Sequence, residues 1–218
     1  MTSIRSLFFP LAMLLSFQAC SSPQSSTTSS NTDMEASANQ TTDTAYLAAG
    51  CFWCIEAIFQ DLKGVISVTS GYTAGQVKNP SYKEVCTGLT GHAEAARIIF
   101  DPSVISFDEL LEVFWKTHDP TTLNRQGADS GTQYRSGIYY ISEAQKATAG
   151  KYKTELDAAG AFESPIVTEI EPFDGTFYVA EDYHQNYYNQ NGDQGYCRMV
   201  IRPKVDKFRK VFGDKLKD

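Results

Sequence analysis

Two cysteines enclose a pair of aromatic residues in the sequence GCFWC, residues 50–54. The segment before Gly50 is typical of a short buried strand and the segment after it of a helix, so Cys51 would lie at the helix N-terminus. Backbone N–H groups and the helix dipole stabilise an anion there, so we expect a lowered pKa for the Cys51 thiol. Cys54 follows one helical turn later and could condense with an oxidised Cys51. The motif therefore predicts redox chemistry centred on Cys51.

A zinc site is one alternative for a Cys-x-x-Cys motif. The other two cysteines of the predicted domain, Cys86 and Cys197, stand far apart, and neither belongs to a second Cys-x-x-Cys. The three histidines, His92, His118 and His184, fall in no ligand spacing such as HxxxH or CxxH. We therefore expect no bound metal ion.

The aromatic residues between the thiols indicate the kind of substrate. Thioredoxin-like motifs usually carry small or polar residues there, because a partner protein must approach the thiol. Phe52 and Trp53 would instead wall an apolar slot beside Cys51. Such a slot suits an S-methyl group, since contacts between sulfur and aromatic rings are favourable. The alternative is that both rings only anchor the helix in the core.

Alternating strand and helix patterns would position these groups. Strands are predicted at 45–50, 65–73, 94–102, 137–142 and 164–172, and helices at 51–62, 105–120, 143–160 and 179–191. The strand at 65–73 is expected to pair with the first strand after a helical crossover. The order predicts an α+β fold, a two-layer sandwich of the ferredoxin-like, split βαβ kind with a mixed sheet and flanking helices. A long polar loop at 121–136 is expected to carry functional residues.

The first 44 residues do not resemble part of this fold. Arg5 and the apolar run 7–19 are typical of a signal peptide, and the run is too short to span a bilayer comfortably. A small residue precedes Cys20, as in the cleavage site of bacterial lipoproteins, so we expect lipid attachment to Cys20; a plain secretory signal is the alternative. Residues 21–44 contain 13 Ser or Thr among 24, too polar a composition to fold. We therefore assign a signal peptide to 1–19, a Ser/Thr-rich flexible tether to 20–44 and a single catalytic domain to 45–218.

The charge balance excludes one class of partner. Removing the N-terminal segment leaves 18 basic and 23 acidic residues, a net charge of −5. This balance argues against a broad nucleic-acid surface. The one basic stretch, 202–210, contains Val205 and Phe208 and is expected to be an amphipathic segment with a solvated charged face. With the predicted leader, these features indicate an exported protein of the bacterial cell envelope, either periplasmic or anchored to the membrane by the lipid.

Several segments in order resemble the peptide methionine sulfoxide reductase A family. They are GCFWCIEAIF, SGYTAG, NPSYKEVCTGLTGHAEAARIIFDP, FWKTHDPTTLNRQGADSGTQYRSGIYY and YVAEDYHQNYY, and the likeness covers nearly all of 46–202. The combination of GCFW, TGHAE and GTQYRS is the most specific part. The resemblance implies an enzyme that reduces methionine S-sulfoxide, in proteins and as the free amino acid, and we expect it to be a monomer. It implies no bound cofactor and a thioredoxin or thioredoxin-like protein as external reductant.

The resemblance also implies roles for individual residues. Cys51 is the nucleophile and becomes a sulfenic acid, while Glu94 in TGHAE donates a proton to the departing oxygen. Glu94 would be the first residue of a strand in a partly apolar site, and such surroundings could keep its carboxyl group protonated near neutral pH. Tyr82 and Tyr134 would hydrogen-bond the sulfoxide oxygen as uncharged donors. Two further residues would contact the substrate, Asp129 near its backbone amide and Tyr187 in a lesser role.

The sulfur that resolves the sulfenic acid stays open. Many family members have Gly at the position of Cys54 and use a cysteine near the C-terminus, which Cys197 in QGYC resembles. Cys54 is near, but two cysteines one turn apart bridge only if the first turn is loose. Cys197 follows a glycine-containing loop that would let it move toward Cys51; the alternative is that Cys197 is a free or structural thiol. We expect Cys54 to resolve first and Cys197 second, and Cys86 to be an inert core residue.

Two alternative functions make different predictions. A thiol–disulfide oxidoreductase using Cys51 and Cys54 would reduce protein disulfides without depending on Glu94. A surface-tethered binding module would hold its cysteines in structural disulfides and leave Cys51 unreactive. The combined motifs favour the reductase over both.

Overall fold

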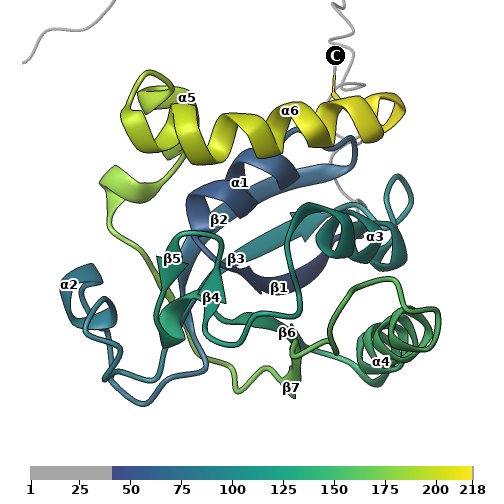
Figure 1. Ribbon diagram of the computed structural model, residues 1–218, viewed down its shortest axis with the longest axis horizontal. Coiled ribbons are helices and arrows are strands. Elements are labelled where there is room, and N and C mark those ends of the chain that lie inside the picture. Colours follow the sequence, from purple (N-terminus) through teal and green to yellow (C-terminus); the bar gives the residue numbers. More distant parts are fainter. Residues whose placement is uncertain (1–40, 218) are drawn as a thin grey trace, which may run out of the picture. The chain divides into compact units, whose positions relative to one another are not determined.

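The computed structural model describes residues 41–217 (Figure 1). The predicted signal peptide, most of the predicted tether and Cys20 lie outside the described residues. The first strand begins at Asp43, so the fold starts two residues earlier than expected. Within 41–217, every helix is too short or too polar to cross a membrane.

A six-stranded mixed sheet carries the fold, in the order β7-β6-β1-β3-β2-β8. The strands are β1 (Asp43–Ala49), β2 (Val65–Thr73), β3 (Ala93–Phe100), β6 (Ser136–Tyr140), β7 (Glu169–Pro172) and β8 (Phe177–Val179). Neighbouring strands are antiparallel except for β6 and β7, which are parallel. The mixed sheet expected from the sequence is confirmed.

The two βαβ units are interleaved. The helix α1 (Phe52–Phe59) connects β1 to β2, but β3 lies between these strands, because Ala96 pairs with Leu47 of β1 on one side and Ser70 of β2 on the other. The expected direct pairing of 65–73 with the first strand is therefore wrong. The helix α3 (Phe107–Thr117) likewise connects β3 to β6 around β1. This interleaving is the ferredoxin-like split βαβ arrangement.

Helices and turns complete the structure. They are α2 (Tyr82–Val85), α4 (Glu143–Ala158), α5 (Tyr187–Asn191) and α6 (Arg202–Val211), with 3₁₀ turns at Thr132–Tyr134, Asp182–His184 and Gly213–Lys215 and a π-helical turn at Cys197–Ile201. Helix α3 begins as its sequence predicts: the Ser106 hydroxyl accepts from the Glu109 N–H, and the Glu109 carboxylate accepts from the Ser106 N–H. Helix α6 runs alongside α1 (Figure 1) and buries Val205 and Phe208, which confirms the amphipathic segment.

The main core lies between the sheet and α1, α3 and α6. Buried apolar side chains from each of these elements meet there, among them Leu47, Ile98, Phe59, Phe114 and Phe208. The opposite face of the sheet carries a smaller cluster around Ala48, Ala95 and Tyr139. On that face the Tyr46 ring stacks on Phe173, with centroids 3.9 Å apart. Because α1 packs in the larger core, its N-terminus is held against the sheet.

Two segments differ from the sequence prediction. Residues 179–191, expected as one helix, form the end of β8, a 3₁₀ turn and α5. Asn186 has φ of 51°, which interrupts the helix, and the Gln185 side chain instead bonds both backbone groups of Ser70. The loop 121–136 contains a short hairpin of β4 (Arg125–Gln126) and β5 (Asp129–Ser130) before the 3₁₀ turn.

Candidate active site

Cys51 stands at the junction of strand β1 and helix α1. It is the N-cap residue of α1, with ψ of 124°, and its carbonyl accepts from the Cys54 N–H at 3.0 Å. Gly50 has φ of +87°, and a Cβ there would lie 2.5 Å from the Cβ of Gln126. Glycine at 50 is therefore required both for the backbone turn and for the close approach of the β4 hairpin. The Cys51 side chain is only 6% exposed.

The pKa values of the two thiols of the motif shift in opposite directions. Burial raises the pKa of Cys51 well above its ordinary value, and the hydrogen bond to Cys54 and the Glu94 carboxyl raise it further. The hydrogen bond from Cys51 lowers the pKa of Cys54 and the Lys204 ammonium lowers it further, although burial acts in the opposite direction. The expectation of a lowered pKa at Cys51 is therefore wrong for the resting pair, because the side chain is too buried and the interaction between the thiols favours the thiolate form of Cys54 over that of Cys51.

Glu94 lies in a buried position beside the thiols. It is the second residue of β3, its side chain is 1% exposed, and its Oε2 accepts from the Phe52 N–H at 3.1 Å. Burial raises its pKa to about 8, although the Phe52 hydrogen bond acts in the opposite direction. Glu94 is therefore protonated at neutral pH, as its motif position suggested, and is not an ordinary exposed strand carboxylate.

Two phenol groups share the electrostatic environment of Glu94. Tyr82 begins α2, and its N–H donates to Glu181 at 2.8 Å. Tyr134 ends the 3₁₀ turn that follows β5. Burial raises the pKa of both phenols well above the ordinary value, and the Glu94 carboxyl adds to the increase at each. The long 121–136 loop thus delivers Tyr134 to the site, and both hydroxyls remain protonated donors.

The aromatic residues of the motif have different environments. Phe52 is buried, with its ring 5.0 Å from that of His184. Trp53 is half-buried and stacks on Tyr187, with ring centroids 3.6 Å apart and an interplanar angle of 6°. Its indole N–H donates to His184 Nδ1 at 3.2 Å. Phe52 therefore also serves as a core anchor, while Trp53 and Tyr187 present a stacked pair at the margin of the core.

Asp129 is held by a residue that the sequence analysis did not single out. The Tyr196 hydroxyl donates to Asp129 Oδ2 at 2.6 Å. Burial and the neighbouring Cys51 raise the pKa of Tyr196, whose hydroxyl is also hydrogen-bonded to that thiol. Its ring meets Trp53 edge-on at 5.8 Å. The QGYC segment was quoted only for its cysteine, yet the tyrosine beside it connects Asp129 to the nucleophile. His184 was likewise considered only as a metal ligand.

Comparison with known proteins identifies the family. The family model for peptide methionine sulfoxide reductase matches residues 43–216. The peptide methionine sulfoxide reductase MsrA of Deinococcus radiodurans is 58% identical over 173 residues, covering 79% of this chain and 84% of that protein. Its counterpart from Picrophilus torridus is 54% identical over 170 residues, covering 78% of this chain and 95% of the relative. The chain belongs to the peptide methionine sulfoxide reductase family.

Solved structures agree with this assignment. Mxr1 from Saccharomyces cerevisiae in its reduced form superposes with a TM-score of 0.67 and 37% identity, covering 72% of this chain and 89% of that one. Methionine sulfoxide reductase A of Corynebacterium diphtheriae gives 0.64 and 40%, covering 72% and 78%. The chain is therefore an oxidoreductase that reduces methionine sulfoxide, and the expected α+β fold is that of its relatives.

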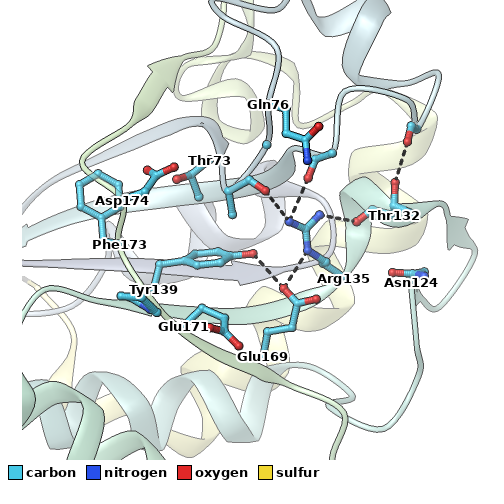
Figure 2. A pocket seen from close by; sticks show the side chains of 15 residues that line it. Thr73, Gln76, Asn124, Thr132, Arg135, Tyr139, Glu169, Glu171, Phe173 and Asp174 are labelled. Atoms are coloured by element: carbon cyan, nitrogen blue, oxygen red, sulfur yellow. Dashed lines mark hydrogen bonds and ion pairs between the residues drawn. The ribbon is translucent and has the colours of Figure 1, made fainter.

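Arg135 of the reductase fixes the loops that carry the phenols (Figure 2). Its guanidinium donates to the carbonyls of Ala74 at 3.2 Å, Gly91 at 3.1 Å and Thr132 at 3.0 Å, and to the Glu169 carboxylate at 2.9 Å. These bonds border a cavity of about 620 Å³ whose lining includes three acidic residues, and none of the predicted site residues lines it. The arginine that follows Tyr134 in GTQYRS therefore has a structural role.

The other two cysteines of the reductase occupy unexpected positions. Cys197 is fully buried at the start of the π-helical turn, so in this structure it does not lie on an exposed, mobile loop. Cys86 is exposed, because α2 is a short surface helix that buries only Val85; the prediction of an inert core residue is wrong. All four cysteines within 41–217 are free thiols, which contradicts the binding module with structural disulfides. The same residues contain no group of three or more acidic, His or Cys side chains placed to hold a metal.

Proposed function

We propose that the reductase acts on the S epimer of methionine sulfoxide, in proteins and as the free amino acid, with Cys51 as nucleophile and Glu94 as proton donor. The observation that carries the proposal is the buried, protonated Glu94 bonded to the N–H of the residue next to Cys51. Reduction of a sulfoxide needs a soft nucleophile that takes up its oxygen and a proton for that oxygen. A carboxyl group with a pKa of about 8 can supply that proton at neutral pH.

The first step balances with the groups present. Cys51 transfers its proton to the Cys54 thiolate and forms an S–O bond to the sulfoxide oxygen, while Glu94 protonates that oxygen. The S–O bond of the substrate breaks with its electron pair returning to sulfur, which releases the methionine thioether. Cys51 is oxidised to the sulfenic acid, methionine sulfoxide is reduced, and the negative charge passes from Cys54 to Glu94. The hydrogen bond between the thiols supports this proton path.

The remaining predicted residues would bind the substrate. Tyr82 and Tyr134 donate to the sulfoxide oxygen without adding charge, and their donation strengthens as negative charge develops. Phe52 and Trp53 hold the methyl group, with Tyr187 stacked behind the indole. Asp129, oriented by Tyr196, accepts from a backbone N–H of the substrate.

An intramolecular disulfide would complete the turnover. Cys54 attacks the Cys51 sulfenic acid first, and Cys197 exchanges into that disulfide second. The buried position of Cys197 requires its turn to open for this exchange. A thioredoxin or thioredoxin-like protein then reduces the disulfide. No bound cofactor is needed, because the electrons come from thiols. We also propose that the enzyme acts as a monomer.

The N-terminal sequence supports an envelope location. The apolar run 7–19 and the small residue before Cys20 favour export and lipid attachment, with 20–44 as a flexible tether. The substrates would then be oxidised envelope proteins. Metabolic labelling with a radioactive fatty acid tests this part. Incorporation into wild type and not into Cys20→Ser supports lipid attachment to Cys20, and absence of label from both proteins contradicts it.

The reaction is tested with the separated S and R epimers of a blocked methionine sulfoxide and dithiothreitol. Reduction of the S epimer alone, abolished in Cys51→Ser, is the expected result. Repeating the assay with thioredoxin on Cys54→Ser and Cys197→Ser assigns the resolving sulfur. Consumption of neither epimer, together with reduction of protein disulfides that persists in Glu94→Gln, would favour the thiol–disulfide oxidoreductase.

A further inference from the structure

A lysine from the last helix contacts the second cysteine of the motif. Lys204 lies in the first turn of α6, and its Nζ donates to Cys54 Sγ at 3.6 Å. Cys54 is 3% exposed and Lys204 is partly buried, so the sulfur of this contact is shielded from water while the lysine is only partly shielded. An ammonium group beside a poorly hydrated sulfur stabilises its thiolate far more than its thiol.

The surroundings of the Cys54 sulfur are mostly apolar. Lys204 and Cys54 line a cavity of about 10 Å³ together with Ile55, Ile58 and His118. Such a volume holds at most about one water molecule, so water reaches the Cys54 sulfur poorly from this side. His118 is held neutral near pH 7, since burial lowers its pKa to about 4, and it adds no second positive charge.

Cys54 therefore has a charge partner, and the competing sulfur has a less favourable setting. Cys197 is fully buried, and burial raises the pKa of its thiol. The titratable and charged groups that face Cys54 are Cys51 on its own helix, Glu94 on β3, His118 after α3, Asp129 on β5, and Tyr196, Cys197 and Lys204 on the C-terminal segment. Lys204 is the positive charge among them at neutral pH.

We propose that Lys204 is a positioning residue that holds Cys54 as a thiolate and so makes Cys54, rather than Cys197, the sulfur that attacks the Cys51 sulfenic acid. This inference rests on the proposed roles of Cys51 and Cys54. After the first step Cys54 carries the proton from Cys51 and returns it to Glu94. The Cys54 thiolate then attacks Cys51 sulfur, the S–S bond forms, and the S–OH bond breaks. Glu94 protonates the departing hydroxide, which leaves as water.

Three variants separate the charge of Lys204 from its packing. Lys204→Met keeps an unbranched apolar stem without the charge, Lys204→Arg keeps a positive charge, and Lys207→Met removes a nearby exposed charge of the same helix. Each reduced protein is mixed with one equivalent of blocked methionine S-sulfoxide without reductant, between pH 5 and 9. Samples are quenched in acid and alkylated, and the disulfides are mapped by mass spectrometry. The methionine released is measured in the same samples.

The Cys51–Cys54 disulfide should form about tenfold more slowly in Lys204→Met at pH 7 for each unit by which the Cys54 pKa rises. The midpoint of its pH dependence should move upward by about one unit or more, which loss of packing alone would not cause. Lys204→Arg should stay close to wild type and Lys207→Met should match it. An unchanged rate and midpoint in Lys204→Met would overturn the inference.

The same measurement distinguishes failure of this inference from failure of the proposed reaction. No methionine from wild-type protein would overturn the proposed reaction. Methionine release with a first disulfide between Cys51 and Cys197 would overturn the resolving role of Cys54. A Cys51–Cys54 disulfide in wild type that forms slowly in Lys204→Met and normally in Lys204→Arg supports the role of the lysine charge.

Discussion

Replacing Glu94 with glutamine should inactivate the enzyme and stabilise it at the same time. Gln keeps the size of the side chain and an oxygen that can accept from the Phe52 N–H, but it cannot transfer a proton. General acid catalysis contributes roughly 10²- to 10⁴-fold, so kcat/KM should fall by about that factor. Wild-type activity should also decline as pH rises through about 8, where Glu94 loses its proton. The residual activity of Glu94→Gln should lack this decline.

The stability change follows from the raised pKa of the carboxyl group. Folded Glu94 has a pKa of about 8 and its ordinary value is 4.5, so the folded state holds the proton between these pH values and the unfolded state does not. The free energy of unfolding of wild type therefore falls as pH rises through this window. At 1.36 kcal/mol per pKa unit, the loss is about 3 kcal/mol at pH 7 and below about 1 kcal/mol at pH 5. Glutamine does not titrate, so the advantage of Glu94→Gln should grow with pH.

Urea denaturation at pH 5, 6, 7 and 8 measures this difference. Glu163→Gln, at an exposed loop position, is the matched control and should follow wild type at every pH. Steady-state reduction of the S epimer on the same preparations gives the activity. A Glu94→Gln variant with wild-type kcat/KM would refute the acid role. A stability difference that does not increase between pH 5 and 7 would refute the buried, protonated carboxyl.

Three further predictions concern the tyrosines of the site and the arginine that fixes the loops around it. Tyr82→Phe and Tyr134→Phe should each lower kcat by about 10²-fold, since each removes one donor to the developing oxyanion, and unchanged kcat in steady-state assays would contradict this. Tyr196→Phe removes the 2.6 Å hydrogen bond to Asp129 and should lower kcat/KM for a peptide sulfoxide about tenfold while the melting temperature stays at the wild-type value. A lowered melting temperature in this variant would indicate a structural role instead. Arg135→Met removes four hydrogen bonds and should lower the free energy of unfolding by about 2–3 kcal/mol in urea titrations, whereas Arg125→Met, at an exposed residue, should change it little.

Local sequence patterns predicted the elements of this fold better than their pairing. The strand at 65–73 and the Ser106 cap were correct because hydrophobic alternation and capping are local signals. The insertion of β3 between β1 and β2 depends on contacts between distant segments, which no local pattern reports. The helix expected at 179–191 failed because Asn186 adopts a left-handed conformation and Gln185 bonds the distant Ser70.

Some residues of the candidate site could likewise be predicted from local motifs, and others could not. Motifs pointed to Cys51, Glu94 and Tyr134, which the fold brings into one electrostatic environment. Nothing in the local sequence marks Tyr196 or Lys204, because each acts through a contact with a segment at least 67 positions away. The sequence also could not predict the direction in which the pKa of Cys51 is shifted. The helix N-terminus was visible there, but the burial of the thiol and its hydrogen bond to Cys54 were not.

The opposite pKa shifts of two neighbouring groups explain how one acid can serve both oxidation steps. Burial raises the pKa of Glu94 from 4.5 to about 8, while Cys51 and Lys204 lower that of Cys54 from its ordinary 9.0. The difference between the two pKa values, ordinarily more than four units, is reduced because the two shifts run toward one another, so moving a proton between the groups costs less free energy than it would in water. Glu94 gives its proton to the sulfoxide oxygen, regains one from Cys54, and is ready to protonate the departing hydroxide. An ordinary exposed carboxylate would hold no proton to give at neutral pH, and an isolated thiol would not return one, so the reaction needs both groups buried together.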